Sequence, residues 1–433
     1  MTPLLDRSSR RPLTGSITVP GDKSISHRAL LIAALSGERS RLGGLNDGAD
    51  VARTRRALVA HGIAVAGNPP GQVEVEGSRL SRWREAGDVV DAGNSGSTAR
   101  MLAGILAAHA ALTVVTGDAS LRARPMLRVV APLRAMGASI DGRAHGDRLP
   151  LVIRGGRLRA LDHELAIASA QVKTALLLAG MHADGTTSVR EPAATRDHTE
   201  LMLAAAGVPV ERGTDTVVMT GRATPSGLEM EVPGDISAAM FFVVAASLLQ
   251  RSELTISGVG LNRTRTIALD VLARMGAKIE RHNTRSSGGE VAGDLHVRAA
   301  SLAGTEVEPH EVTGAIDEIP ALAIAATQAD GATTFRGIGE LRTKESDRVD
   351  AMISGLRAVG ATASADADSL VVEGPVPLQG GRVDSRGDHR IAMAFAVAGM
   401  ISAAPVRVSK WSCVDTSFPG FLDVLGRAQG RKR

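Results

Sequence analysis

The hexapeptide VPGDKS at residues 19–24 returns as VPGDIS at residues 232–237, and the two copies divide the 433-residue chain into nearly equal parts. Internal self-similarity is the sequence mark of a repeated architecture. A chain of this length can build two or three domains with substantial hydrophobic cores. Because the repeat falls near the middle, we expect two.

A shorter motif recurs six times: an amphipathic stretch that closes at a glycine and is followed by a short apolar run, as in LRAMGASI and LRAVGATA. A glycine can adopt the left-handed conformation that ends a helix, so each copy predicts a helix followed by a strand. Any α/β protein can end helices in this way. Six copies at spacings of 75, 70, 69, 84 and 66 residues, three on each side of the second VPGD segment, instead favour six small α/β units; the glycines are Gly62, Gly137, Gly207, Gly276, Gly360 and Gly426.

A second series of six segments is alanine-rich and apolar nearly all round, which is typical of central buried helices. Their first turns are nevertheless polar. Helix N-termini present free backbone N–H groups and a positive dipole end, so several of them facing one cleft would bind an anion. The segments begin at DKSISHR (22–28), NSGSTAR (94–100), SAQVK (169–173), DISAAM (235–240), DEIPAL (317–322) and DHRIAM (388–393).

Composition excludes several classes of function. Aromatic residues make up only 2% of the chain and tyrosine is absent, which argues against modules that stack nucleic-acid bases. The net charge is only +4, from 50 basic and 46 acidic residues, and suits small anionic substrates better than a polyanion. The single cysteine, Cys413, excludes an internal disulfide and a cysteine-based zinc cluster. No segment resembles a signal peptide or a membrane span, so we expect a cytoplasmic protein without membrane or nucleic-acid partners.

Two lysines stand out because only six of the 50 basic residues are lysines. Lys23 lies in the first turn of a predicted helix, where a cation is unfavourable by some tenths of a kcal/mol. Either Asp22 offsets it as the helix N-cap, or a bound dianion does. Lys344 and Arg348 are predicted to share one face of a helix that begins at Thr343. This face is either simply solvated or holds an anion between its two cations.

Further candidates are Arg124 and Arg196, both expected at helix starts, and Asp317, an acid in an otherwise apolar segment. Asp317 either caps its helix or has a raised pKa suited to proton transfer. His27 and His389 lack the spacing of metal ligands, so we expect neither a metal nor another cofactor.

The strings VPGDKSISHR, DAGNSGSTAR, SLRARPM, ASAQVK, TRDHTE, IDEIPALAIAA, LRTKESDR, DHRIAMAF and TSFPGF, in this order, together resemble the 5-enolpyruvylshikimate-3-phosphate synthases. The resemblance runs from about residue 15 to 425. It implies an enzyme of the enolpyruvyl transferase family. Such an enzyme transfers the enolpyruvyl group of phosphoenolpyruvate to the 5-hydroxyl of shikimate 3-phosphate and releases phosphate, in the shikimate pathway of chorismate and aromatic amino acid biosynthesis.

The resemblance also implies the α/β fold of that family: two domains, each an inside-out α/β barrel of three βαβαββ units. Residues 21–234 would form one lobe and residues 1–20 with 235–433 the other, with hinge crossovers near 19–22 and 232–235. Substrates would bind between the lobes of a monomer, and closure would exclude water.

Site residues follow from the same resemblance. Asp317 would take the proton of the hydroxyl, and Glu345 would protonate the methylene carbon and later remove a proton; Lys23 would touch both substrates. Shikimate 3-phosphate would be held by Lys23, Ser24, Arg28, Ser169, Ala170, Gln171, Arg196, Asp317 and Lys344. Phosphoenolpyruvate, and glyphosate as an inhibitor in its place, would be held by Lys23, Asn94, Gly96, Arg124, Gln171, Arg348, His389 and Arg390.

The chain departs from the best-known members of the family at Ala170, Arg196, Glu340 and Thr416. These positions place the phosphate contacts and the response to glyphosate in question. Two other functions remain open: the sister enolpyruvyl transferase that acts on UDP-N-acetylglucosamine, and a non-catalytic anion-binding protein on the same scaffold. The sister enzyme generally has Lys-Asn where this chain has Lys23-Ser24, and a loop cysteine, whereas Cys413 lies far from the RARP loop.

Overall fold

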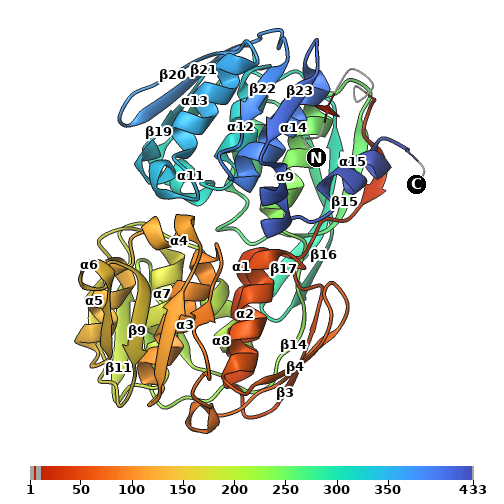
Figure 1. Ribbon diagram of the computed structural model, residues 1–433. Coiled ribbons are helices and arrows are strands. Elements are labelled where there is room, and N and C mark those ends of the chain that lie inside the picture. The colour runs from red at the N-terminus through yellow and green to blue at the C-terminus, as the bar shows by residue number, and fades with distance from the viewer. Residues whose placement is uncertain (1–3, 6–10, 432–433) are drawn as a thin grey trace. The chain divides into compact units, whose positions relative to one another are not determined.

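The computed structural model describes residues 4–5 and 11–431 of the chain. These residues form two compact units (Figure 1). The N-unit consists of Gly21–Val232 together with Ser286–Glu290. The C-unit consists of the described residues up to Pro20, of Pro233–Arg285, and of Val291 onward. Residues 1–3, 6–10 and 432–433 of the predicted second lobe lie outside the described residues.

The N-unit contains three four-stranded sheets and three buried central helices, α1 (Lys23–Leu35), α3 (Gly96–Ala108) and α7 (Ala170–Gly180). The sheet orders are β14-β3-β5-β4, β6-β7-β9-β8 and β10-β11-β13-β12. Their strands are β3 (Arg39–Gly43), β4 (Ala64–Gly67), β5 (Val73–Glu76), β6 (Val90–Asp91), β7 (Leu112–Thr116), β8 (Ser139–Gly142), β9 (Arg148–Arg154), β10 (Asp162–Glu164), β11 (Thr186–Arg190), β12 (Val210–Arg212), β13 (Thr216–Thr220) and β14 (Glu229–Glu231). The remaining helices are α2 (Ala49–Ala60), η2 (Leu80–Arg82), α4 (Ala119–Ala123), α5 (Leu127–Ala135), α6 (Arg143–Gly146) and α8 (His198–Ala205).

The C-unit repeats this plan around α9 (Ile236–Leu248), α12 (Ile319–Ala326) and α14 (His389–Ile401) (Figure 1). Its sheet orders are β16-β17-β15-β2, β18-β19-β21-β20 and β1-β23-β22. Their strands are β1 (Leu4–Leu5), β2 (Thr14–Ile17), β15 (Glu253–Gly260), β16 (Lys278–Ser287), β17 (Glu290–Arg298), β18 (Glu306–Val307), β19 (Gly331–Arg336), β20 (Thr362–Ala365), β21 (Ser369–Gly374), β22 (Gly381–Asp384) and β23 (Val406–Ser409). The remaining helices are α10 (Ile267–Arg274), α11 (Pro309–Gly314), η3 (Ile338–Thr343), α13 (Arg348–Ala358), η4 (Trp411–Thr416) and α15 (Phe421–Ala428).

The prediction of six α/β units is therefore confirmed, and one unit shows how each is built. Strand β6 is parallel to β7, β7 is antiparallel to β9, and β9 is antiparallel to β8. Parallel strands need a crossover connection, and α3 supplies it. Three sheets take a strand from far along the chain, because β2 pairs with β15, β14 pairs with β3, and β1 pairs with β23.

Glycine ends five of the six amphipathic helices as predicted. Gly62, Gly137, Gly207, Gly276 and Gly360 all have positive φ angles and directly follow the C-caps of α2, α5, α8, α10 and α13. The prediction is wrong for Gly426, which lies inside α15. That helix continues to Ala428 because Gly430, at φ 69°, offers the left-handed conformation four residues later.

A hairpin tip that the sequence did not indicate is part of the N-unit. Strands β16 and β17 meet at residues Ser286–Glu290, which group with the N-unit although the strands themselves belong to the C-unit. The Glu231 N–H donates to Ser287 Oγ at 2.8 Å, and His198 Nδ1 lies 2.6 Å from Glu290 Oε1. A Cβ on Gly289 would lie 2.7 Å from the carbonyl oxygen of Leu201, so glycine permits this close approach.

The central helices confirm the expectation of burial. Every residue of α9 from Ile236 to Ser247 is buried, and α12 is buried throughout. Within the described part of the chain, none of the helices has both the length and the apolar character needed to cross a membrane.

Candidate functional site

The three central helices of the N-unit all begin with a side-chain cap. Asp22 Oδ1 accepts a hydrogen bond from the Ile25 N–H, which confirms Asp22 as the N-cap of α1. Ser95 caps α3 and Ser169 caps α7 in the same way. Asp22 and Ser95 are buried, and the first turns that follow all three caps present polar groups from otherwise apolar helices.

One cluster joins the starts of α1, α7 and α8 around Ser24. Arg196 Nη1 donates to Ser24 Oγ at 3.1 Å, and Arg28 donates to the Ser24 carbonyl at 3.0 Å and the Ala170 carbonyl at 3.2 Å. Arg28 is only 2% exposed. Burial and the nearby Arg196 lower the pKa of Arg28 to about 10. The structure therefore brings together four of the predicted residues, and Arg196 lies at a helix start as predicted, one residue before the N-cap Asp197.

A second cluster joins the starts of α3 and α7. Gln171 Nε2 donates to Ser97 Oγ at 3.0 Å, and Arg100 Nη1 donates to Gln171 Oε1 at 2.8 Å. A Cβ on Gly96 would lie 2.8 Å from Arg100 Nη1 and 3.5 Å from Arg124 Nη1. Two guanidinium groups thus approach the start of α3 at the one position in it that has no side chain.

Arg124 belongs to this second cluster, because its Nη2 lies 2.5 Å from Asn94 Oδ1. Its predicted position at a helix start is wrong: Arg124 is the C-cap of α4, with an extended backbone at ψ 145°. The reason is Pro125, which disfavours the helical conformation in the residue before it.

Lys23 donates from Nζ to Asp50 Oδ2 at 2.9 Å, and both side chains are largely buried. Asp50 lies in the first turn of α2, where a carboxylate is favoured by the helix dipole. The cation in the first turn of α1 therefore has two carboxylates beside it, the cap Asp22 and the partner Asp50.

In the C-unit, the guanidinium of Arg348 joins three carboxylates. Its Nε lies 2.8 Å from Asp388, Nη1 lies 2.9 Å from Asp317, and Nη2 lies 2.6 Å from Glu345. The Arg348 side chain is 1% exposed, whereas those of Asp317 and Glu345 are 19% and 20% exposed. Burial alone would lower the pKa of Arg348, but Asp388, Glu345 and Asp317 outweigh burial and raise it.

Asp317 does not cap its helix, because the N-cap of α12 is Glu318. Its side chain pairs with Arg348 instead, and this cation favours the ionised carboxylate. The structure thus excludes one of the two roles that the sequence left open for Asp317, because this residue is not a helix cap.

The predicted helix start at Thr343 is wrong. Residues Ile338–Thr343 form the 3₁₀ helix η3, and α13 begins at Arg348 with Asp347 as its cap. The Asp347 carboxylate accepts from the Asp350 N–H, and aspartate caps helices at least as well as threonine. Lys344 therefore lies before the helix, so it does not share a helical face with Arg348.

Lys344 pairs instead with Glu340, at 3.3 Å between Nζ and Oε2. Glu340 is one of the positions at which the sequence departs from the best-known members of the family. Burial lowers the pKa of Lys344, and the carboxylates of Glu340 and Asp317 partly oppose this shift.

The start of α14 supplies His389 and Arg390, which are 2% and 4% exposed. Asp388 caps this helix through the Arg390 N–H at 2.9 Å and so links α14 to Arg348. Among the described residues, the buried Nε of Arg390 has no hydrogen-bond partner. A buried donor without a partner is costly, so this guanidinium is suited to an anionic ligand.

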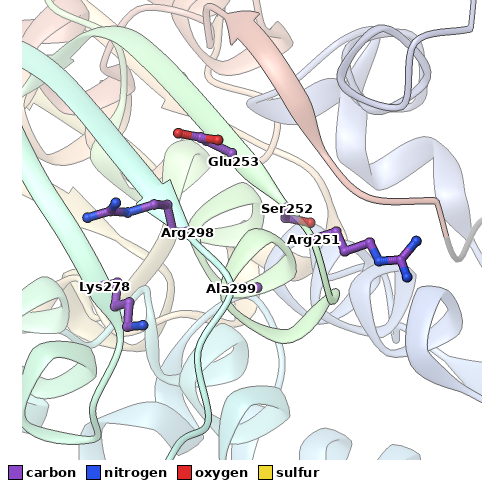
Figure 2. A pocket seen from close by; sticks show the side chains of 6 residues that line it. All are labelled: Arg251, Ser252, Glu253, Lys278, Arg298 and Ala299. Atoms are coloured by element: carbon purple, nitrogen blue, oxygen red, sulfur yellow. The ribbon is translucent and has the colours of Figure 1, made fainter.

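A surface pocket on the C-unit lies apart from all the predicted site residues. Figure 2 shows its lining, in which the side chain of Arg251 points away from those of Lys278 and Arg298. Arg298 already pairs with Glu280 at 2.5 Å, and Glu253 lies 3.3 Å from His296. We therefore assign no function to this pocket.

Sequence reasoning missed four residues that hold the predicted ones in place: Asp50, Ser97, Arg100 and Asp388. Ser97 and Arg100 lie within NSGSTAR, and Asp388 is the first residue of DHRIAM, so the signal was available for three of them. An arginine in a helix that is otherwise buried indicates a specific partner. Asp50 gave no such signal, because an acid in the first turn of an amphipathic helix is favoured by the helix dipole alone.

Comparison with known proteins gives one answer along the whole chain. Residues 8–425 match the family model for EPSP synthase (3-phosphoshikimate 1-carboxyvinyltransferase). A relative with the latter name from Desulforamulus reducens is 45% identical over 415 residues, covering 96% of this chain and 97% of the relative. Another from Anaeromyxobacter sp. strain K is 49% identical over 421 residues, covering 97% and 94%.

Solved structures agree with this answer. An EPSP synthase from Acinetobacter baumannii superposes with a TM-score of 0.88 at 38% identity, covering 99% of this chain and 97% of that one. The enolpyruvyl transferase NikO from Streptomyces tendae, at 18% identity and a TM-score of 0.77 over 96% of this chain and 95% of that one, shares the fold. The two-domain enolpyruvyl transferase fold predicted from the sequence is thereby confirmed, and the chain belongs to the EPSP synthase family.

Proposed function

We propose that this enzyme transfers the enolpyruvyl group of phosphoenolpyruvate to the 5-hydroxyl of shikimate 3-phosphate and releases phosphate, the reaction for which its family is named. The observation that carries the proposed mechanism is the guanidinium of Arg348. It holds Asp317 and Glu345 at 2.9 and 2.6 Å, which places two carboxylates suited to proton transfer beside one cation. The names of the family and its relatives do not favour transfer to UDP-N-acetylglucosamine.

For shikimate 3-phosphate, the cluster at Ser24 supports binding of the phosphate. Arg28 and Arg196 lie close enough for Arg196 to lower the pKa of Arg28, and two adjacent guanidiniums are stabilised by a dianion. Further polar groups at the starts of α1 and α7 come from Ser24, Ser169, Ala170 and Gln171. Lys23, Asp317 and Lys344 are proposed to contact the ring hydroxyls.

For phosphoenolpyruvate, the cluster at Gly96 supports binding of the phosphate and carboxylate groups. Arg124 and Asn94 lie together at the start of α3. Arg100 donates both to Gln171 and to the carbonyl of Pro125, the residue after Arg124. In the C-unit, three of the five N–H groups of Arg348 serve its carboxylates, which leaves two for a ligand. Arg390 and His389 complete the set, together with Lys23.

The proposed chemistry is addition followed by elimination. Asp317 takes the proton of the hydroxyl as its oxygen bonds to the central carbon of phosphoenolpyruvate, while Glu345 gives a proton to the methylene carbon. In the second step the bond between that carbon and the phosphate oxygen breaks, and Glu345 removes a proton from the methyl group. The arginines and lysines neutralise the leaving phosphate.

The proposal needs substrate contacts from both units, with the crossovers near 19–22 and 232–235 as the hinge between the two predicted lobes. We also propose that the enzyme acts as a monomer in the cytoplasm and that glyphosate binds in place of phosphoenolpyruvate.

The test compares turnover with the two possible acceptors and measures the activity of one variant that preserves charge. We expect turnover with shikimate 3-phosphate and none with UDP-N-acetylglucosamine. Lys23→Arg keeps the pair with Asp50, but its forked group does not fit between two anions already lined by arginines, so activity should fall sharply. Lys278→Arg, on the exposed strand β16, is the matched control. Near-normal activity of Lys23→Arg would remove Lys23 from the site, and turnover of UDP-N-acetylglucosamine would replace the proposed acceptor.

A further inference from the structure

A buried lysine that the proposed chemistry does not use lies directly behind the Ser24 cluster. Lys173 of α7 is 1% exposed and donates from Nζ to Glu191 at 2.8 Å and to Glu200 at 2.6 Å. Glu200 is also 1% exposed and Glu191 is 7% exposed at the side chain. Three charges are therefore removed from water at one point, an arrangement that is stable only while all of them remain paired.

In each of two helices, the residue next to a member of this triad contacts Arg28. Arg28 Nε donates to Thr174 Oγ1 at 3.2 Å and to Thr199 Oγ1 at 2.9 Å. Thr174 follows Lys173 in α7, and Thr199 precedes Glu200 in α8. The negative charge of Glu200 acts on Arg28 across this pair of threonines and partly opposes the lowering of its pKa.

Arg28 itself has only neutral oxygens as hydrogen-bond partners, from Ser24, Ala170, Thr174 and Thr199. Within the described part of the chain, no carboxylate lies within ion-pair distance of it. A guanidinium that is 2% exposed and has no carboxylate within ion-pair distance remains available to a bound anion. Glu200 is a nearby buried carboxylate that would compete with a bound anion for Arg28 if it were not paired with Lys173.

The triad also reaches the loop that carries Arg196. Glu191 follows strand β11, and its second oxygen accepts a hydrogen bond from Thr195 Oγ1. Thr195 directly precedes Arg196, which contacts Ser24. Lys173 thus acts on both guanidiniums: on Arg28 through the charge of Glu200, and on Arg196 through the position of the loop.

We propose that Lys173 is a positioning residue for the anion site at Ser24. By pairing with both Glu191 and Glu200, it prevents these carboxylates from competing for Arg28 and Arg196 and leaves both guanidiniums to a phosphate dianion. The inference rests on the proposed function, in which this dianion is the phosphate of shikimate 3-phosphate.

Charge-restoring double variants separate this role from simple packing. In the native triad one ammonium faces two carboxylates; Lys173→Met removes the ammonium, and a second change of one glutamate to glutamine returns the net charge to its native value. We expect Lys173→Met to raise the dissociation constant for shikimate 3-phosphate, measured by titration calorimetry, by about tenfold or more, as for loss of a hydrogen bond to a charged group. The KM for phosphoenolpyruvate should change by less than about twofold, since most of its proposed ligands lie outside the Ser24 cluster.

The double variants Lys173→Met/Glu200→Gln and Lys173→Met/Glu191→Gln should both fold and bind shikimate 3-phosphate within about threefold of the native enzyme, because neither leaves an extra buried charge. Lys278→Met is the control for loss of an exposed lysine. Native affinity in Lys173→Met, or failure of both double variants to recover affinity or to fold, would overturn the proposal.

Arg196→Ala tests the assignment of the phosphate to the Ser24 cluster separately from the role of Lys173. It should weaken shikimate 3-phosphate binding whether or not Lys173 has the role proposed here. An unchanged affinity in Arg196→Ala would remove the assignment of the phosphate to this cluster. A weakened affinity in Arg196→Ala together with native affinity in Lys173→Met would keep that assignment and remove only the role of Lys173.

Discussion

Asp317 is a carboxylate held by a cation rather than one isolated in an apolar pocket. Its pairing with Arg348 fixes the position of the carboxylate, and the 19% exposure of its side chain leaves it accessible to a ligand. A base of this kind is strengthened by its fixed position more than by a high proton affinity.

Replacing Asp317 by asparagine should therefore remove proton transfer and preserve binding. We expect kcat to fall by about 10² to 10⁴, the range of general-base contributions, while the affinity for shikimate 3-phosphate changes little because the amide still forms hydrogen bonds. The measurements are phosphate release and titration calorimetry. Asp350→Asn, which breaks the exposed pair with Arg386, is the control. A loss smaller than about tenfold would assign the base to another group.

Glycine is needed at position 96 because a side chain there has little room, and not because of the backbone conformation. An added methyl group would meet Arg100 Nη1 at 2.8 Å, the end of a flexible side chain that itself contacts Gln171. Gly96→Ala should thus displace Arg100 and narrow the proposed phosphoenolpyruvate site without unfolding the helix.

We expect Gly96→Ala to weaken inhibition by glyphosate by about 10- to 200-fold, the cost of one intruding methyl group, and to raise the KM for phosphoenolpyruvate less, because glyphosate is the longer molecule. Inhibition constants from competition kinetics measure both effects. Gly37→Ala, which has open space around its Cβ position, is the control. Equal losses for both ligands, or a native enzyme indifferent to glyphosate, would contradict this role of Gly96.

At the scale of helices and strands, we expect alanine substitution to have opposite effects on stability at two glycines of the repeat. Gly360 has φ 86° after the end of α13, where an alanine is strained and its Cβ would lie 3.0 Å from Gln379 Cγ. Gly426 lies inside α15, and its Cβ would meet only Arg431, at 4.0 Å.

Gly426→Ala should therefore raise the free energy of unfolding of the C-unit by about 0.5–1 kcal/mol, whereas Gly360→Ala should lower it by about 1–2 kcal/mol. Trp411, whose ring centroid lies 6.0 Å from that of Phe421, reports on this unit by fluorescence in urea when Trp83 is replaced by phenylalanine. Changes of the same sign in both variants would show that Gly426 also serves as a helix terminator.

Two of the predicted helix starts were wrong, although five of the six predicted helix ends were confirmed. Thr343 is a good cap by residue type, but Asp347 lies four residues later and competes for the same role. Pro125 turned Arg124 from a helix start into a helix end. Gly288-Gly289 is a local signal for a hairpin turn, but the place of the tip had no local signal, because it depends on Met230 and Leu201, which are distant in sequence.

For the whole molecule, the repeats predicted the six α/β units because each unit must bury the same kind of central helix and end the same kind of surface helix. The candidate site was less predictable. Residue types and motif order indicated Arg28, Arg196, Asp317 and Arg348, but only tertiary contacts reveal their partners. Asp50 and Lys173 are the clearest cases, because their roles depend on charges brought together from separate helices.

The proposed reaction needs both substrates together and breaks the bond between the central carbon of phosphoenolpyruvate and its bridging oxygen. It is tested most directly with phosphoenolpyruvate that carries a heavy oxygen isotope in the bridging position between carbon and phosphorus. We expect phosphate to be released only when shikimate 3-phosphate is also present, and the released phosphate to contain the heavy isotope. Phosphate release from phosphoenolpyruvate alone, or phosphate without the label, would contradict it.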